Sequence, residues 1–151
     1  MKYIAKFEEA EEGGFTVTFP DAPGAITEGD SEDSARAMAK DALEGWLQTQ
    51  LNVKRLPPRP AFKGSGVPIV IDADLALKLE LRWAREEAGL TQAELAQLVG
   101  VGQQRIAALE SPGREVKLST ASRVMSALGR ELTVSSVKLA SKRLTPATAR
   151  R

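Results

Sequence analysis

The sequence contains neither cysteine nor histidine. Without cysteine the chain has no disulfides, no thiolate nucleophile and no cysteine zinc site. Without histidine it lacks the usual general base and the commonest metal ligand of proteins. Catalysis by this chain would therefore have to rest on carboxylates.

The sequence also lacks a run of about eighteen apolar residues, the length that a membrane-spanning helix requires. Its first residues, MKYIAKFEEAEEGG, have no long apolar stretch before the acidic run, unlike a secretory signal. We therefore expect a cytoplasmic protein with no membrane partner.

The net charge of +1 is divided unevenly along the chain. Residues 1–51 hold 4 basic and 11 acidic side chains, a balance of −7, whereas residues 52–151 hold 17 basic and 9 acidic side chains, a balance of +8. Two halves of opposite sign predict two different partners. A chain of 151 residues is long enough for two small domains that each bury a modest core.

The acidic half has the pattern of a small antiparallel sheet followed by one helix. Alternating apolar residues on both sides of the turn at 11–14 predict a hairpin, whose apolar face carries Tyr3, Ala5, Phe7, Phe15, Val17 and Phe19. Residues 20–24 end the second strand, and residues 25–27 supply a third. Asp30 or Ser31 caps the helix, and we interpret its apolar stripe as core: Ala35, Met38, Ala39, Ala42, Leu43, Trp46 and Leu47.

Residues 52–66 crowd prolines and then glycines into a stretch without periodicity, which predicts a linker or an irregular edge. Residues 67–71 can add an edge strand, since Pro68 is tolerable only at an edge. We therefore predict a first domain at 1–66, an edge strand and joint at 67–73, a helical domain at 74–137 and a basic tail at 138–151.

The second half is helical throughout, with helices predicted near 74–88, 92–99, 103–110 and 119–128. Thr91 with Glu94 makes a capping box, and Ser119 is a candidate cap for the last helix. Gly89, Gly100 and Gly129 stand where left-handed helix ends favour glycine. The fold class is therefore α+β, with a small antiparallel sheet and one helix followed by an all-α domain.

The segment GLTQAELAQLVGVGQQRIAALE resembles the helix-turn-helix of the phage-repressor-like (XRE) DNA-binding family, and the resemblance covers about residues 74–130. It implies that Arg85 late in the first helix pairs with Glu110 at the end of the recognition helix. One position departs from the family, because Gly102 replaces the usual Ser or Thr. The cap of the recognition helix is therefore weaker, and no hydroxyl is present there to bind a phosphate.

In such a motif the N-terminal residues of the recognition helix reach base edges in the major groove. We therefore expect Gln103, Gln104 and Arg105 to read bases, since amides match adenine and guanidinium matches guanine. Gln92 is expected to bind a phosphate at the start of the preceding helix. The remaining candidate DNA-binding residues are Gly102, Ala108, Arg114 and Lys117.

A second resemblance spans essentially the whole chain. The Tyr-x-Ala of the first strand, the segment GGFTVTFPDAPGAITEGDSEDSARAMAKDAL, and above all FPD-x-PG followed by T-x-GD are similar to the HicB family of antitoxins. The resemblance implies a reduced RNase H-like N-terminal domain that masks a small RNA-cleaving toxin, HicA, and a C-terminal domain that represses its own operon. Candidate toxin-binding residues are Asp21, Glu28 and Asp30.

Two other functions compete with this one. An active RNase H-like nuclease would need a carboxylate in the middle of its first strand, but residues 2–7 contain none, so we expect no enzyme, no metal and no cofactor. A transcriptional regulator whose N-terminal domain senses a small molecule is the alternative that stays open. Such a domain would need a concave apolar site rather than eleven acids in 51 residues.

The first helix of the helical half has two apolar rows, Leu77, Leu81, Ala84 and Ala88 on one side and Leu75, Leu79 and Trp83 on the other. A small helical domain buries only one row, so the second needs a cover. We predict at least a homodimer joined through this half, with further apolar residues at Leu132, Val134, Val137 and Leu139. Contact of the spare row with the first domain is the alternative.

Overall fold

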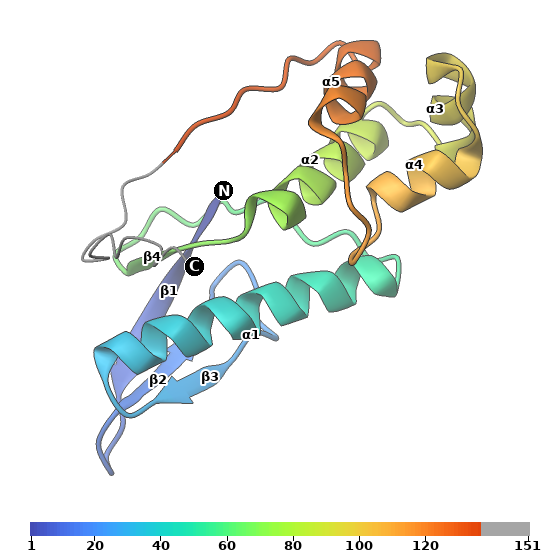
Figure 1. The fold of residues 1–151 in the computed structure, drawn as a ribbon. Helices are drawn as coiled ribbons and strands as arrows, with labels where there is room; N and C mark the ends of the chain where they lie inside the picture. The colour runs from blue at the N-terminus through green and yellow to red at the C-terminus, as the bar shows by residue number, and fades with distance from the viewer. Residues whose placement is uncertain (137–151) are drawn as a thin grey trace, which may run out of the picture.

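The computed structural model describes residues 1–136 and has the predicted α+β fold, with a sheet and long helix at one end and a group of short helices at the other (Figure 1). The elements in chain order are β1 (Lys2–Glu9), β2 (Phe15–Thr18), β3 (Thr27–Gly29), α1 (Glu32–Asn52), β4 (Val67–Val70), α2 (Ala73–Glu87), α3 (Gln92–Val99), α4 (Gln103–Leu109) and α5 (Leu118–Ala127). No helix within this part of the chain is long and apolar enough to span a bilayer. The specific RNase H-like assignment remains a prediction.

The sheet is antiparallel throughout, with the strand order β3-β2-β1-β4. β4 pairs only with β1, so Pro68 lies on an edge strand, where a missing N–H is tolerated. β3 begins at Thr27, two residues later than predicted. The reason is a pair of turns, in which Ala22 donates to the carbonyl of Phe19 and Ala25 donates to that of Ala22.

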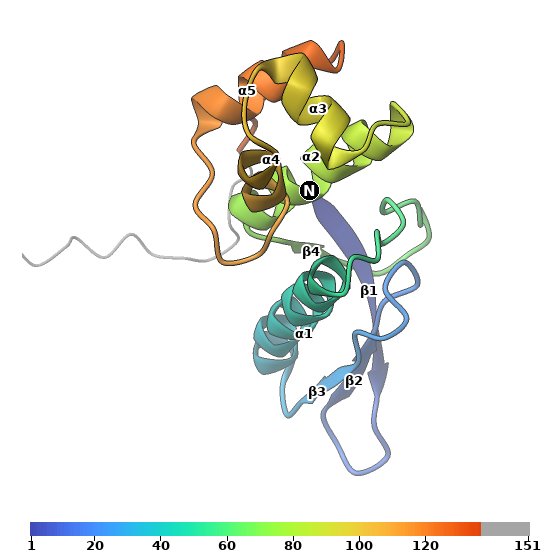
Figure 2. The same cartoon turned by 90° about the vertical axis from the view of Figure 1, so that its right-hand side faces the viewer.

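α1 lies along one side of the sheet, as Figures 1 and 2 show. Ser31 caps it through a capping box with Ser34. Its buried residues repeat every four positions and are Ala35, Ala39, Leu43, Leu47 and Leu51. The assignment of Met38 to the core is wrong, because this side chain is 46% exposed. Met38 precedes Ala39 by one residue and so lies about 100° around the helix, beside the buried row.

α2 contributes residues to two hydrophobic cores of the described chain. Leu75, Leu79 and Trp83 pack into the core between the sheet and α1, whereas Leu81 and Ala84 pack into the core of the short helices. The N-terminal half therefore covers the spare apolar row, in agreement with the alternative prediction, and this row gives no support for a dimer. The core that includes β1 continues into β4 and α2, so a cut at residue 66 would remove part of it.

The proline-rich segment after α1 is packed against α2. The indole Nε1 of Trp83 donates to the Pro57 carbonyl at 2.8 Å, and the Arg59 guanidinium lies 4.5 Å from the Trp83 ring centre. Arg59 also bonds Glu80 at 2.8 Å and Glu87 at 2.9 Å. These contacts attach the segment to the shared helix rather than leaving it as a free linker.

The helix-turn-helix follows the sequence pattern closely. Thr91 and Glu94 form the predicted capping box, and Gly100 ends α3 in the left-handed conformation at φ 74°. The core of this part consists of Leu81, Ala84, Leu95, Ala96, Ile106, Leu109, Ala121, Val124 and Met125. Ser119 does not cap α5, because the helix already begins at Leu118 with Lys117 as its N-cap. Val137, Leu139 and the basic tail at 138–151 lie outside the described residues.

Candidate DNA interface and acidic surface

α4 presents its N-terminal end to solvent. Gly102 stands at its N-cap with φ −70° and ψ 147° and makes no side-chain cap bond, as the missing hydroxyl predicts. Gln103, Gln104 and Arg105 are all exposed in the first turn. Ile106 and Leu109 are buried, so the three polar residues face away from the core and are available to a ligand. Ala108 is half-buried on the same helix.

Arg85 and Glu110 form a buried, two-pronged ion pair. Nε of Arg85 lies 2.6 Å from Oε1 of Glu110, and Nη2 lies 2.9 Å from Oε2. The hydrogen bond to Glu110 raises the pKa of Arg85, although burial opposes the shift. Arg85 also donates to the Leu90 carbonyl at 2.7 Å. The pair therefore fixes α2 against the end of α4 and against the turn that enters α3.

Gln92 joins this pair. Its Nε2 donates to Oε2 of Glu110 at 3.0 Å, and the side chain is half-buried. The sequence predicted a phosphate contact for Gln92, and the structure shows that part of its amide already has a protein partner. Its role toward DNA therefore stays a prediction, while its role in joining α3 to the end of α4 is visible directly.

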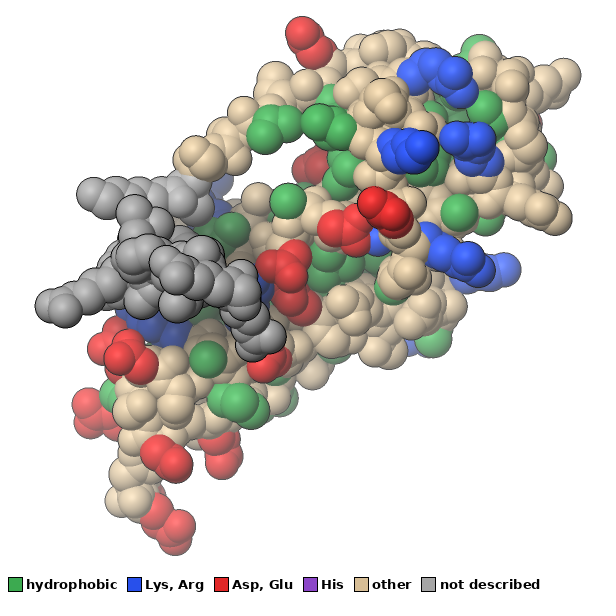
Figure 3. All heavy atoms as spheres, in the orientation of Figure 1, with side chains coloured by type: hydrophobic (Ala, Val, Ile, Leu, Met, Phe, Trp, Pro, Cys, Tyr) green, Lys and Arg blue, Asp and Glu red, His purple; other side chains and the backbone are tan. Residues whose placement is uncertain are grey.

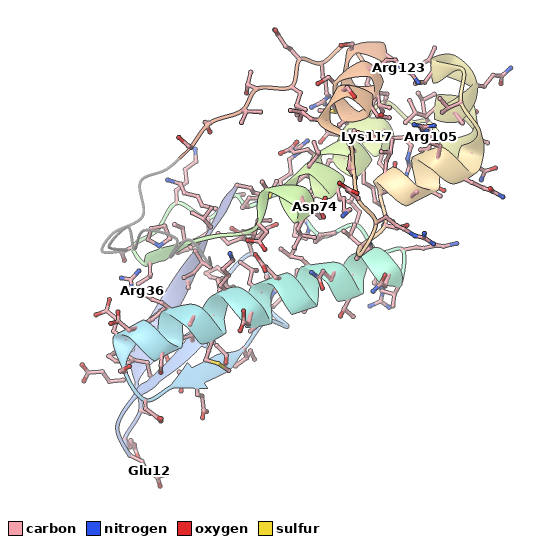
Figure 4. All side chains as sticks on the ribbon, viewed as in Figure 1. Glu12, Arg36, Asp74, Arg105, Lys117 and Arg123 are labelled. Carbon is pink, nitrogen blue, oxygen red and sulfur yellow. The ribbon has the colours of Figure 1, made fainter. Side chains whose placement is uncertain are left out.

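Exposed cations follow α4. Arg114 lies in the connection to α5 and Lys117 at the N-cap of α5, and both are exposed. Figure 3 shows blue side chains gathered over the short helices, and Figure 4 places Arg105, Lys117 and Arg123 near one another there. Sequence reasoning missed Arg123, since its spacing within α5 predicts exposure but not that it lies on the same face of the short helices as Arg105 and Lys117.

The acidic residues predicted to bind the toxin have two different environments. Asp21 accepts the backbone N–H groups of Ala61 and Phe62 at 3.0 and 2.9 Å, so it holds the proline-rich segment in place. Glu28 and Asp30 are exposed at the far end of the sheet. They line a cleft of about 370 Å³ together with residues of the β1–β2 turn, including Glu11 and Glu12, and Figure 3 shows acidic side chains around this end.

This acidic end presents charge without a recognisable metal site. Within residues 1–136, no three Asp or Glu side chains come close enough together to hold a metal ion. The side chain of Glu12 projects from the tip of the hairpin in Figure 4, well away from the short helices. The acidic surface and the exposed cations of the helix-turn-helix thus lie at opposite ends of the molecule.

Two sequence families match the chain, and they meet within α2. The family described as HicB_like antitoxin of bacterial toxin-antitoxin system matches residues 2–80, and the family described as helix-turn-helix matches residues 81–134. The first match takes in the sheet, α1 and the first half of α2, including Leu75 and Leu79. The second takes in the helices that carry the exposed cations.

Known relatives agree with these matches, and two of them match along most of the chain. Antitoxin HicB 2 of Photorhabdus laumondii is 36% identical over 132 residues, which cover 87% of this chain and 94% of that protein. Antitoxin HicB of Escherichia coli K12 is 31% identical over 135 residues, which cover 89% of this chain and 98% of that protein. An uncharacterized HTH-type transcriptional regulator of Methanothermobacter thermautotrophicus is 51% identical over 51 residues, covering 34% of this chain and 74% of that protein. The chain therefore belongs to the HicB family of antitoxins and carries a helix-turn-helix domain.

Proposed function

We propose that this chain is the antitoxin of a type II toxin–antitoxin system, acting in the cytoplasm, which masks a HicA-like RNA-cleaving toxin and represses its own operon by binding operator DNA. The observation that carries the proposal is the separation of charge, with acids around the far end of the sheet and exposed cations on the helix-turn-helix. Family membership indicates a regulatory rather than an enzymatic role.

The acidic surface suits a toxin that cuts RNA. A protein that binds the phosphate backbone of RNA must present cations, and an acidic surface attracts the same cations. Glu11, Glu12, Glu28 and Asp30 meet around one cleft and are exposed, so we place the toxin contact there. Asp21 lies apart from this cleft and stays a predicted toxin contact, although its Oδ2 already accepts the backbone N–H groups of residues 61 and 62.

The helix-turn-helix supplies the DNA contact. With α4 in the major groove, Gln103 and Gln104 reach base edges, and Ala108 can meet a thymine methyl group. Arg114 and Lys117 lie on the connection after α4, where flexible cations bind phosphates. Gly102 at the N-cap brings backbone rather than a hydroxyl to the DNA.

The DNA-binding form is proposed to be at least a homodimer joined through the C-terminal half. Two recognition helices one turn of DNA apart are the usual arrangement of this motif. Val134 is 79% exposed, and Leu132 is half-buried beside a groove of about 890 Å³ that Leu77, Leu118 and Met125 also line. Light scattering at micromolar concentration should give at least twice the chain mass of 16.2 kDa, and a monomer would contradict the proposal.

The toxin contact is tested by reversing charge at two positions of the full chain. The protein encoded beside this chain is purified with it, and binding is measured by calorimetry for the double variant Glu28→Lys/Asp30→Lys. We expect affinity to fall roughly tenfold or more, since like charges placed together cost several kcal/mol. Glu131→Lys is the matched control, because Glu131 is an exposed acid in the helical half. Equal losses for both variants, or none for either, would place the contact elsewhere.

A further inference from the structure

Arg105 lies on a different side of α4 from Gln104, the residue at the centre of the outer face of this helix. Successive helical residues are about 100° apart. The buried residues Ile106 and Leu109 set the core side of α4, so Gln104 and Ala108 lie nearly opposite it. Arg105 falls between these two sides, about a quarter turn from the centre of the outer face. Its guanidinium therefore leaves the helix sideways, toward the edge of the groove that α4 would occupy.

Two more cations lie on the same face of the short helices as Arg105. Figure 4 labels Arg105 on α4 and Lys117 and Arg123 on α5, and Figure 3 shows blue side chains on this face. Lys117 is the N-cap residue of α5, and Arg123 lies in the middle of the same helix. Two elements thus contribute to a single exposed group of positive charge.

These three cations have no acidic partner within residues 1–136. Most other arginines of this part of the chain are paired, namely Arg36, Arg59, Arg82, Arg85 and Arg130. None of the ion pairs of the described chain includes Arg105, Lys117 or Arg123. Because solvent and salt screen exposed charges, these cations repel one another only weakly, and no carboxylate of this part of the chain competes with an external anion for them.

We propose that Arg105, Lys117 and Arg123 form one phosphate-binding cluster, the α4–α5 cluster, which holds the DNA strand that borders the major groove containing α4. Arg105 then contacts the backbone instead of a base, and Arg123 extends the interface onto α5. The inference rests on the proposed DNA binding and adds a division of labour to it. Gln104, at the centre of the outer face, distinguishes sequences, and the cluster supplies affinity for any duplex.

The test is a titration of the full chain against two duplexes at several salt concentrations. One duplex is the DNA immediately upstream of the gene for this chain, and the other is a scrambled duplex of the same length and composition. Each of Arg105→Ala, Lys117→Ala and Arg123→Ala should weaken binding to both duplexes by the same factor. Each should also reduce the magnitude of the salt slope by about 0.9, the value for one phosphate that is no longer neutralised.

Two kinds of variant sharpen the result. Arg105→Lys and Arg123→Lys should retain the wild-type salt slope, because lysine binds phosphate as a point charge, whereas it cannot replace arginine in a two-pronged bond to guanine. Arg36→Ala is the control, since Arg36 is an exposed arginine on α1 that is already paired with Glu32. It should leave both affinities unchanged, and circular dichroism should show native folding for every variant.

Two outcomes would overturn the α4–α5 cluster, and a third would contradict the proposed function instead. Weaker binding to the upstream duplex alone for Arg105→Ala would make Arg105 a base reader and overturn the inference. An unchanged salt slope for Arg123→Ala would remove α5 from the interface and overturn it as well, while DNA binding by the wild type would leave the proposed function intact. Failure of the wild type to prefer the upstream duplex would instead contradict repression of its own operon.

Discussion

Leu79→Ala should destabilise the whole molecule, because Leu79 lies on the helix that both cores share. Its side chain is fully buried in the core between the sheet and α1, while Leu81 and Ala84 of the same helix belong to the other core. Truncation of a buried leucine to alanine costs about 2 to 5 kcal/mol through lost transfer free energy and an unfilled cavity. For a protein of this size, each kcal/mol lowers the melting temperature by roughly 2 to 4 °C.

The expected result is a single unfolding transition lowered by roughly 4 to 20 °C. Tryptophan fluorescence reports on the first core, where Trp83 is buried and Trp46 is half-buried, and far-UV circular dichroism reports on all helices. Both signals should shift together. Leu98→Ala is the control, since Leu98 is 58% exposed and its truncation should change stability by no more than about 0.5 kcal/mol. A fluorescence shift with a second, unshifted helical transition would refute the shared role of α2.

Three further predictions concern the DNA-binding half. Gln104→Ala should weaken operator binding by roughly 1 to 3 kcal/mol per half-site and leave affinity for scrambled DNA nearly unchanged. Filter binding on both duplexes measures this, and equal losses on the two would mean that Gln104 is only a solvent-exposed surface residue. Glu110→Ala should cost about 3 to 5 kcal/mol in urea unfolding, because Arg85 loses its buried partner and keeps only the longer contact with the exposed Glu86. Adding Arg85→Met should recover most of that loss, and a double variant as unstable as the single one would argue against this. The pKa of Glu94 lies below its ordinary value because the carboxylate accepts the backbone N–H of Thr91, so its stabilising contribution is present near neutral pH and is lost as the pH falls through that lowered pKa. Unfolding at a series of acidic pH values should show a shallower acid-side loss for Glu94→Gln, and identical pH profiles would contradict the capping role.

Local signals accounted for the helix-turn-helix. The capping box of Thr91 and Glu94 and the left-handed Gly100 are set by neighbours within a few residues, and α3 has the predicted bounds. The pairing of Arg85 with Glu110 could be predicted only through the family resemblance, since the two are 25 positions apart. Ser119 shows the limit of local reasoning, because Ser, Thr and Lys crowd the start of α5 and several starting points satisfy the pattern.

Contacts between residues far apart in the sequence determine the features that local patterns could not predict. Both rows of α2 were visible in the sequence, but periodicity does not say which surface covers each row. The charge of Asp21 predicted a toxin contact, but the sequence could not show that its Oδ2 accepts the N–H groups of residues 61 and 62, which lie about forty positions away. The composition of residues 52–66 predicted a linker or an irregular edge. The contacts that hold this segment against α2, from Arg59 to Glu80 and from Trp83 to Pro57, join residues more than twenty positions apart.

Our central proposal is that the acidic surface of this chain binds and silences a ribonuclease encoded beside it. The most direct measurement is cleavage of a labelled RNA by that purified neighbouring protein, with increasing amounts of the full chain. We predict that cleavage stops near a one-to-one ratio, that the Glu28→Lys/Asp30→Lys variant fails to stop it, and that the chain alone leaves the RNA intact. Undiminished cleavage at excess wild-type chain, or cleavage by the chain itself, would contradict this function.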